Sequence, residues 1–151
     1  MSKQIIQRAV VPPAAPVTPA SNGGGFSAGA VSLTLPYPPS VNTYWRRHGN
    51  RYFISKAGKL FRQAVLTEVE SAAKSLPAGD IEWSVFARLR MVIELFPGDR
   101  RRRDVDNSAK AVLDSLAFAV VYPDDEQIDE LIIRRREVSK PGYCTVLVEE
   151  I

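Results

Sequence analysis

Four consecutive arginines run directly into two aspartates near the middle of the chain. The stretch from Arg100 to Lys110 reads Arg-Arg-Arg-Arg-Asp-Val-Asp-Asn-Ser-Ala-Lys. If Asp104 and Asp106 lie in a strand, their side chains point to the same face, about 6 to 7 Å apart. Adjacent carboxylates repel each other unless a cation lies between them, and Mg²⁺ bound by one or two carboxylates, phosphate oxygens and water is the usual solution. The stretch therefore predicts a metal site beside which arginines hold a polyanion.

Hydrolysis of a phosphodiester is the chemistry that these residue types could perform. The enzyme must activate a water molecule and neutralise the charge that builds up on the phosphate, and divalent metal ions at carboxylate-rich sites do both. The acidic turn at Asp124 and Asp125 could supply a third carboxylate, provided that the strands on either side of the intervening helix are neighbours. Lys110 would place a positive charge beside the scissile phosphate.

Each of these motifs also has an ordinary structural explanation. Aspartates are common at strand ends and helix caps, and Asp124 with Asp125 is a normal turn sequence. Lys110 could simply form i,i+4 ion pairs with Asp106 and Asp114, each worth a few tenths of a kcal/mol. The combination is more specific than its parts.

Two further groups of cations flank this stretch. Lys and Arg outnumber Asp and Glu by only 20 to 17, but the pI is about 9.2 and the arginines are clustered. One group is the run from Arg134 to Arg136. The other follows a proline-rich loop, in which aromatic rings interleaved with cations could either cover the edge of the core or stack on bases unpaired at a branch point. The candidates for DNA contact in this region are Asn42, Tyr44, Arg46, Arg47 and Arg51.

The elements that must position these residues follow from hydrophobic periodicity. Apolar residues alternate over 31–35, 84–96, 128–138 and 143–150, which predicts four strands, with Arg88, Arg90 and Glu94 on a mostly polar face of the second. Apolar residues at helical spacing predict helices over 55–76 and from Asp106 to Val120, with Ser55 and Asp106 as N-caps. We expect one α+β domain: a mixed sheet of about four strands with two packed helices, in the order β-α-β-α-β-β.

Composition indicates how the chain is divided and where the protein is found. Residues 1–29 are rich in proline and glycine, so we expect a disordered arm there and one folded domain over 30–151. Cys144 is the only cysteine, which favours a cytoplasmic setting and excludes an intramolecular disulfide. With His48 as the only histidine, a site built on several histidines is excluded as well. No stretch is long and apolar enough to span a membrane.

Three motifs resemble the RusA family of Holliday-junction resolvases. They are the proline-rich stretch from Leu35 to Asn42 with Tyr44 after it, the run from Arg100 to Lys110, and the turn from Asp124 to Ile128. The motifs occur in the family's order and at similar spacing, and the resemblance covers residue 31 to the C-terminus.

The resemblance implies a homodimeric, Mg²⁺-dependent endonuclease, commonly of phage or prophage origin, with Mn²⁺ able to substitute for Mg²⁺. It would make paired cuts in four-way DNA junctions during recombination and repair. The metal-binding and catalytic carboxylates implied are Asp104, Asp106 and Asp125, the second aspartate of its pair, and the catalytic lysine is Lys110. The DNA-binding side chains would include Arg100, Arg101, Arg102 and Arg103.

Two other functions remain open from the sequence. The chain could be a broader nuclease that cuts flaps or replication forks, or a non-catalytic dimer that recognises the shape of a junction. A pure binding protein gains nothing from carboxylates that face DNA, which counts against the second alternative. A major-groove reader is disfavoured, because no helix combines basic and amide side chains for base contact.

Overall fold

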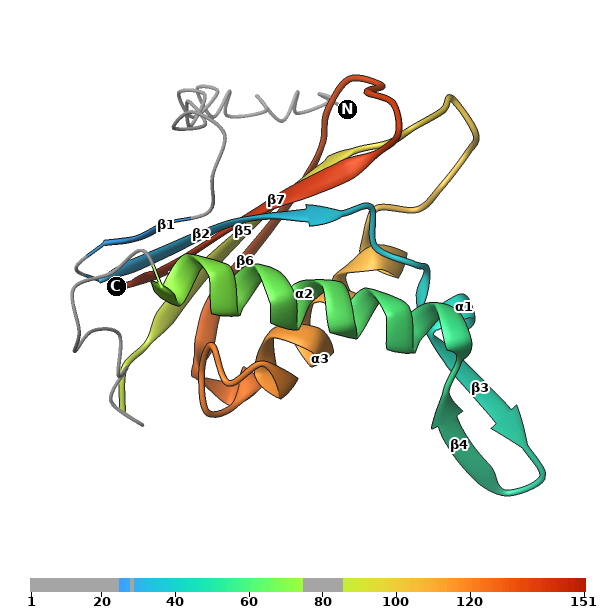
Figure 1. Ribbon diagram of the computed structural model, residues 1–151, viewed down its shortest axis with the longest axis horizontal. Coiled ribbons are helices and arrows are strands. Elements are labelled where there is room, and N and C mark those ends of the chain that lie inside the picture. The colour runs from blue at the N-terminus through green and yellow to red at the C-terminus, as the bar shows by residue number, and fades with distance from the viewer. Residues whose placement is uncertain (1–24, 28, 75–85) are drawn as a thin grey trace, which may run out of the picture.

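The computed structural model describes residues 25–27, 29–74 and 86–151 (Figure 1). A five-stranded mixed sheet has the order β1-β2-β7-β5-β6. Only β5 and β6 run parallel, and the other neighbouring pairs are antiparallel. The strands span Gly25–Ser27 (β1), Ala30–Pro36 (β2), Leu89–Phe96 (β5), Ile128–Arg135 (β6) and Tyr143–Glu150 (β7).

Two helices pack on one face of this sheet, as Figure 1 shows. They are α2 (Lys56–Lys74) and α3 (Ala109–Phe118). Ser55 caps α2, because its hydroxyl accepts the backbone N–H of Gly58 at 3.0 Å. The expected α+β class and the order of the six expected elements are confirmed.

The core lies between the helices and the inner face of the sheet. Alternate residues of each strand enter it, as the period of two requires. Cys144 is one of these residues, and complete burial raises the pKa of its thiol to about 12, as expected for a core cysteine. The inner-face residues exposed by at most 1% are Val31, Leu33, Leu35, Leu89, Met91, Ile93, Leu95, Cys144, Val146 and Val148.

The opposite face of β5 is less polar and less exposed than its sequence suggests. Val92 and Glu94 are only 7% and 8% exposed, although both point away from the helices. Glu94 Oε1 accepts hydrogen bonds from Arg136 and lies 3.5 Å from Arg134 Nη1, both contributed by or next to β6. Long-range ion pairs therefore cover this face, which a period-two pattern within one strand cannot predict.

Two of the expected boundaries need correction. Ordered chain begins before residue 30, because β1 pairs with β2 from Gly25 opposite Ser32 to Ser27 opposite Ala30. The rest of the expected arm, residues 1–24 and 28, lies outside the described residues, as do the expected helix end at 75–76 and the expected strand start at 84. Strand β6 ends at Arg135 rather than at Val138.

A β-hairpin follows the proline-rich loop, in a stretch for which the sequence predicted no element. A short helix, α1 (Val41–Tyr44), leads into β3 (Trp45–His48), and β4 (Arg51–Ile54) returns antiparallel to it. The two strands form a sheet of their own, and Figure 1 shows them projecting from the body beyond the start of α2. None of the helices within the described ranges could cross a membrane.

Candidate active site

The loop that carries the arginines and aspartates leaves the sheet at the end of β5 and enters α3. Residues 97–105 form no strand, so the expected side-by-side placement of Asp104 and Asp106 on one strand is wrong. Asp106 instead opens a 3-10 turn, η1 (Asp106–Ser108), with Val105 at its N-cap position and no side-chain cap, so the expected capping role of Asp106 is wrong too. Both carboxylates are exposed to solvent.

Gly98 fixes the point at which this loop turns away from the sheet. A Cβ at residue 98 would lie 2.4 Å from the carbonyl oxygen of Pro141, so only glycine lets the two turns lie against each other. The backbone N–H of Ser139 also donates to the carbonyl of Pro97 at 2.9 Å. The loop thus starts from a rigid point at the sheet edge.

Arg103 holds the loop through contacts with its own neighbours. Its guanidinium donates to Asp99 at 2.6 and 2.9 Å, and its Cζ lies 5.6 Å from the ring centroid of Tyr37. The adjacent Arg103 guanidinium, helped by the backbone N–H of Arg101, holds the pKa of Asp99 well below its usual range. Arg103 therefore has a structural role in this loop, and its phosphate contact stays a prediction.

The other three arginines of the run are exposed. Arg101 lies 3.7 Å from Asp99 with 83% of its side chain exposed. Within the described ranges, neither Arg100 nor Arg102 forms an ion pair. These three guanidiniums are available to an external anion.

Two hollows meet at Asp104. One is lined by the loop and by Arg135 of β6, and the other by the loop, by the proline-rich segment and by η1. A cation therefore borders the carboxylates on each side. The first hollow is lined by Arg102, Arg103, Asp104, Val105, Asp106 and Arg135.

Arg135 belongs to this site, although sequence reasoning noted only that it lies within a basic run. Its guanidinium donates to the carbonyl oxygen of Arg103, next to Asp104. Arg134 and Arg136 point to the opposite face of the strand, toward Glu94. The alternation of side chains along β6 could have separated the roles of these three arginines.

Lys110 lies at the start of α3, between two aspartates. Its Nζ is 2.5 Å from Asp114 Oδ1 and 3.4 Å from Asp125 Oδ2. The ion pair with Asp114, followed by the charge of Asp125, raises the pKa of Lys110. Lys110 is therefore a cation at neutral pH and would act through its charge. Lys110 therefore forms both the i,i+4 ion pair with Asp114, its ordinary structural explanation, and the contact with Asp125 that the proposed site requires.

Asp125 reaches Lys110 because β5 and β6 are parallel neighbours, as the sequence argument required. Helix α3 returns the chain along the sheet, and Val120 then ends it in the left-handed region with φ 58°. The N–H groups of Val120 and Val121 donate to Ala117 and Leu116, the hydrogen bonds of a Schellman ending. A second 3-10 turn, η2 (Asp125–Gln127), precedes β6.

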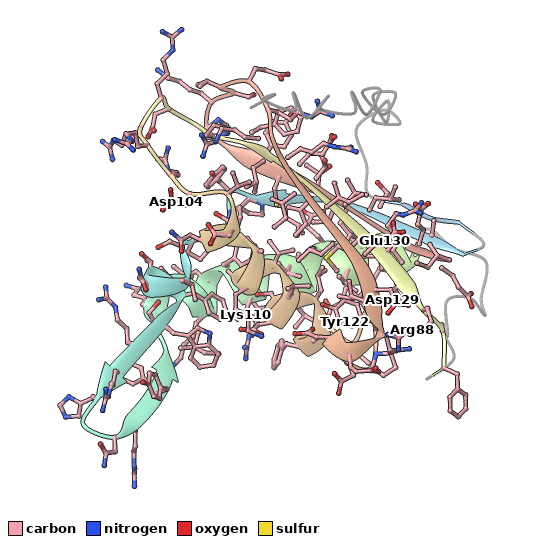
Figure 2. All side chains as sticks on the ribbon, turned by 180° about the vertical axis from the view of Figure 1, so that it is seen from behind. Arg88, Asp104, Lys110, Tyr122, Asp129 and Glu130 are labelled. Carbon is pink, nitrogen blue, oxygen red and sulfur yellow. The ribbon has the colours of Figure 1, made fainter. Side chains whose placement is uncertain are left out.

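One oxygen of Asp125 is available for a further ligand. Asp125 Oδ1 is buried and has no hydrogen-bond partner within the described ranges. Tyr122 lies nearby, and burial together with the Asp125 charge raises the pKa of its hydroxyl, which donates to the Leu113 carbonyl at 3.0 Å. An unpartnered carboxylate oxygen costs free energy unless a cation or water satisfies it. Figure 2 shows Asp104 on the loop before α3, Lys110 on α3 and Tyr122 beyond its end.

The donor chemistry fits a hard divalent cation. Asp104, Asp106 and Asp125 offer carboxylate oxygens, which Mg²⁺ prefers, and Mg²⁺ needs only one or two carboxylates besides water and phosphate oxygens. However, no three acidic, histidine or cysteine side chains of the described residues gather closely enough to form a metal cluster. The predicted set of three aspartates is thus divided between the loop and the Lys110 side of α3.

Tyr44 is not available for DNA contact. Its side chain is completely buried, and its hydroxyl lies 3.3 Å from Ser115 Oγ and accepts from Arg62 at 3.0 Å. The predicted contact is wrong because the short α1 helix turns this ring into the core. Asn42 and the three hairpin arginines Arg46, Arg47 and Arg51 are exposed, as DNA contact would require.

Comparisons with known proteins point to one family. A family model described as endodeoxyribonuclease RusA matches residues 36–148. A protein of Enterobacteria phage HK97 named crossover junction endodeoxyribonuclease is 41% identical over 121 residues, which are 79% of this chain and 93% of its own. A protein of the same name from Escherichia coli K12 is 34% identical over 120 residues, which are 80% of this chain and 94% of its own. Another, from Enterobacteria phage 82, is 31% identical over 119 residues, which are 79% of this chain and 93% of its own.

Proposed function

Because this chain belongs to the RusA family of endodeoxyribonucleases, we propose that it cuts four-way DNA junctions by hydrolysing phosphodiester bonds at the Asp104 site. The observation that carries the proposal is the meeting of two hollows at Asp104, with exposed carboxylates and arginines around them. A surface of this kind binds a polyanion through the arginines and brings its phosphates to the carboxylates.

We infer that Asp104, Asp106 and Asp125 would hold Mg²⁺, with Mn²⁺ as a substitute. A divalent ion at these carboxylates would lower the pKa of a bound water and neutralise charge on the phosphate. The buried Oδ1 of Asp125 supports this role, because no hydrogen bond satisfies it among the described residues, although the Tyr122 hydroxyl lies nearby.

The protein's own groups would bind, orient and neutralise the substrate. Arg100, Arg101 and Arg102 would hold backbone phosphates, and Arg135 would fix the carbonyl of Arg103 and thereby the position of Asp104. Lys110, kept protonated by Asp114 and Asp125, would stabilise the charge that develops in the transition state.

A homodimer would suit a four-way junction. Paired cuts on opposing strands need two equivalent sites related by a two-fold axis, and a symmetric dimer provides them. We expect the enzyme to act in the cytoplasm, since its substrate is DNA. Sedimentation at increasing protein concentration would measure the dimer directly, and a chain that stays monomeric when bound to a junction would contradict it.

The test compares four substrates: a mobile four-way junction, a flap, a replication fork and linear duplex, each with Mg²⁺ or EDTA. We expect metal-dependent paired nicks in the junction. Asp106→Asn should abolish cleavage while keeping junction binding, because the change removes a carboxylate and preserves shape. Equal loss of binding and cleavage would make Asp106 structural.

Asp124→Asn is the matched control for the acidic turn. The Asp124 side chain accepts the N–H of Glu126 at 3.0 Å, and asparagine can keep that bond. We expect Asp124→Asn to cleave normally and Asp125→Asn to be inactive. Preferred cleavage of flaps or forks would favour the broader nuclease, and junction binding without cleavage in any metal would favour the non-catalytic binder.

A further inference from the structure

The projecting hairpin is rigid at its base and open to solvent at its tip. An isolated two-stranded hairpin is marginally stable, so its attachment matters. Trp45 Nε1 donates to Asp114 Oδ2 at 3.2 Å, and the N–H of Ser55 donates to the Tyr44 carbonyl at 2.9 Å. Both ends of the hairpin are thus bound to the helical layer, while β3 and β4 pair only with each other among the described strands.

One face of the hairpin carries an exposed aromatic ring beside a cation. Tyr52 pairs with Arg47 across the strands, and the Arg47 guanidinium lies 5.7 Å from the ring centroid. The side chain of Tyr52 is 68% exposed, which is unusual for a large aromatic residue that contributes nothing to the core. Trp45 lies on the same face, two residues before Arg47.

These side chains line a shallow hollow. Its walls are the rings of Tyr52 and Trp45, and the exposed amide of Asn42 lies at its edge. An aromatic ring, a guanidinium plane and an amide with both donors and acceptors are the groups that bind an unpaired base by stacking and edge hydrogen bonds. The lining residues are Val41, Asn42, Trp45, Arg46, Arg47 and Tyr52.

The hairpin is positively charged, which favours an anionic partner. Residues 45–54 contain three arginines and one histidine but no carboxylate. Bases within a regular duplex are stacked on one another and do not offer their faces. Bases at the point where strands exchange can offer them, because stacking is interrupted there.

Building on the proposed function, we propose that the hairpin face formed by Trp45, Arg47 and Tyr52, with Asn42 at its edge, binds a nucleobase unstacked at the branch point of DNA. The face is connected to the reaction site. Asp114 accepts from Trp45 through Oδ2 and from Lys110 through Oδ1. The hairpin therefore contacts, through Trp45, the same carboxylate that pairs with the catalytic lysine.

The experiment compares Tyr52→Ala with Tyr52→Phe, and uses Phe53→Ala as the matched control. Phe53 neighbours Tyr52 on the same strand, is 49% exposed and points to the opposite face. Affinity is measured without metal for a four-way junction, the same junction lacking bases at the branch point, and linear duplex.

Loss of one stacked base predicts that Tyr52→Ala lowers junction affinity roughly 5- to 100-fold. Duplex affinity should stay unchanged, and both Tyr52→Phe and Phe53→Ala should bind the junction as wild type does. On the junction that lacks branch-point bases, wild type and Tyr52→Ala should bind equally. An equal loss on intact and base-less junctions, on duplex, or in Phe53→Ala would overturn the proposal.

A measurement on the unaltered chain guards against misfolded variants. Iodouracil at the branch point should form its photochemical crosslink to Tyr52 or Trp45, as identified by mass spectrometry, and crosslinks only elsewhere would contradict the proposal. Cleavage by wild type and by Asp106→Asn, assayed in parallel, keeps the two proposals separate. A hairpin that binds no base leaves metal-dependent cleavage intact, whereas a wrong assignment of function leaves no cleavage to measure.

Discussion

The arginines near the two ends of strand β5 differ in whether they form ion pairs within the protein. At the first end, Arg88 pairs with Asp129 and Glu126, and Arg90 pairs with Glu130 and Glu149. Figure 2 shows Arg88 beside Asp129 at this end. Beyond the last residue of β5, Arg100 and Arg102 form no ion pair within the described ranges. The chain thus pairs both arginines at the first end with carboxylates and leaves Arg100 and Arg102 without ion pairs at the other. Unpaired cations beside exposed carboxylates are what the proposed DNA-binding end requires.

The largest expected effect separates these two ends by DNA affinity. Replacing both Arg100 and Arg102 by alanine should weaken junction binding about 100-fold at 0.1 M salt, because each lost phosphate contact is worth roughly tenfold there. The slope of log affinity against log salt should fall by about two. Arg88→Ala is the control. It should change neither the junction affinity nor the salt slope, because the Arg88 guanidinium is already paired with Asp129 and Glu126. Filter binding at several salt concentrations measures this, and equal effects of the two variants would remove the contrast.

Glu94, in the middle of β5, tests whether internal pairing stabilises the fold. Glu94→Gln removes the charge that holds Arg134 and Arg136, so the free energy of unfolding should fall by about 2 kcal/mol. Glu130→Gln is the control at the paired end, and its exposed position should make its effect too small to measure. Urea unfolding followed by circular dichroism gives both values. If Glu130→Gln lowered the free energy of unfolding as much as Glu94→Gln, burial would not explain the effect of Glu94.

Backbone strain at the C-terminal end of α3 offers a smaller test. Val120 adopts φ 58°, a backbone conformation that costs glycine little but strains a β-branched residue. Val120→Gly should raise the free energy of unfolding by about 1 kcal/mol, even after the greater freedom of unfolded glycine is counted. Thermal melting would show a midpoint roughly 4 °C higher. A lower midpoint would mean that the valine side chain makes contacts worth more than its strain.

The smallest effect concerns Asp99, the carboxylate that restrains Arg103 at the open end. Because Arg103 lowers the pKa of Asp99 in the folded state, Asp99 stabilises the fold above its ordinary pKa of about 3.9. That contribution is lost as the pH falls from there toward the folded value. The stability difference between wild type and Asp99→Asn should therefore shrink below pH 4. A difference that is constant from pH 7 to pH 2 would show that the ion pair contributes nothing.

Sequence periodicity predicted the elements that have one buried face. Strand β7 has the expected bounds, Tyr143–Glu150, and Ser55 begins α2 as expected. The hairpin was missed because both of its faces are exposed, so residues 45–54 show no alternation of apolar and polar types. Tyr44 was misassigned because its burial depends on the turn of α1, which local pattern does not reveal.

The candidate site was predicted in its residue types and only partly in its geometry. The contact of Lys110 with Asp125 follows from neighbouring strands, a condition that the sequence argument could state in advance. The restraint of Arg103 by Asp99 and the role of Arg135 depend on how a loop without regular structure folds back. Contacts of this kind leave no periodic pattern in the sequence, so they can be seen only in the three-dimensional structure.

The parallel pairing of β5 and β6 has one more consequence. Asp104, Asp106, Lys110, Asp114 and Asp125 all belong to the single connection between these two strands. The hairpin comes from an earlier part of the chain and touches that connection through Trp45 and Asp114. The proposed reaction site and the proposed base-binding face therefore come from separate segments of the chain that meet at Asp114. Exchanging the hairpin between relatives should change which DNA structures are cut while the chemistry of cutting stays the same, provided that the contact with Asp114 is kept.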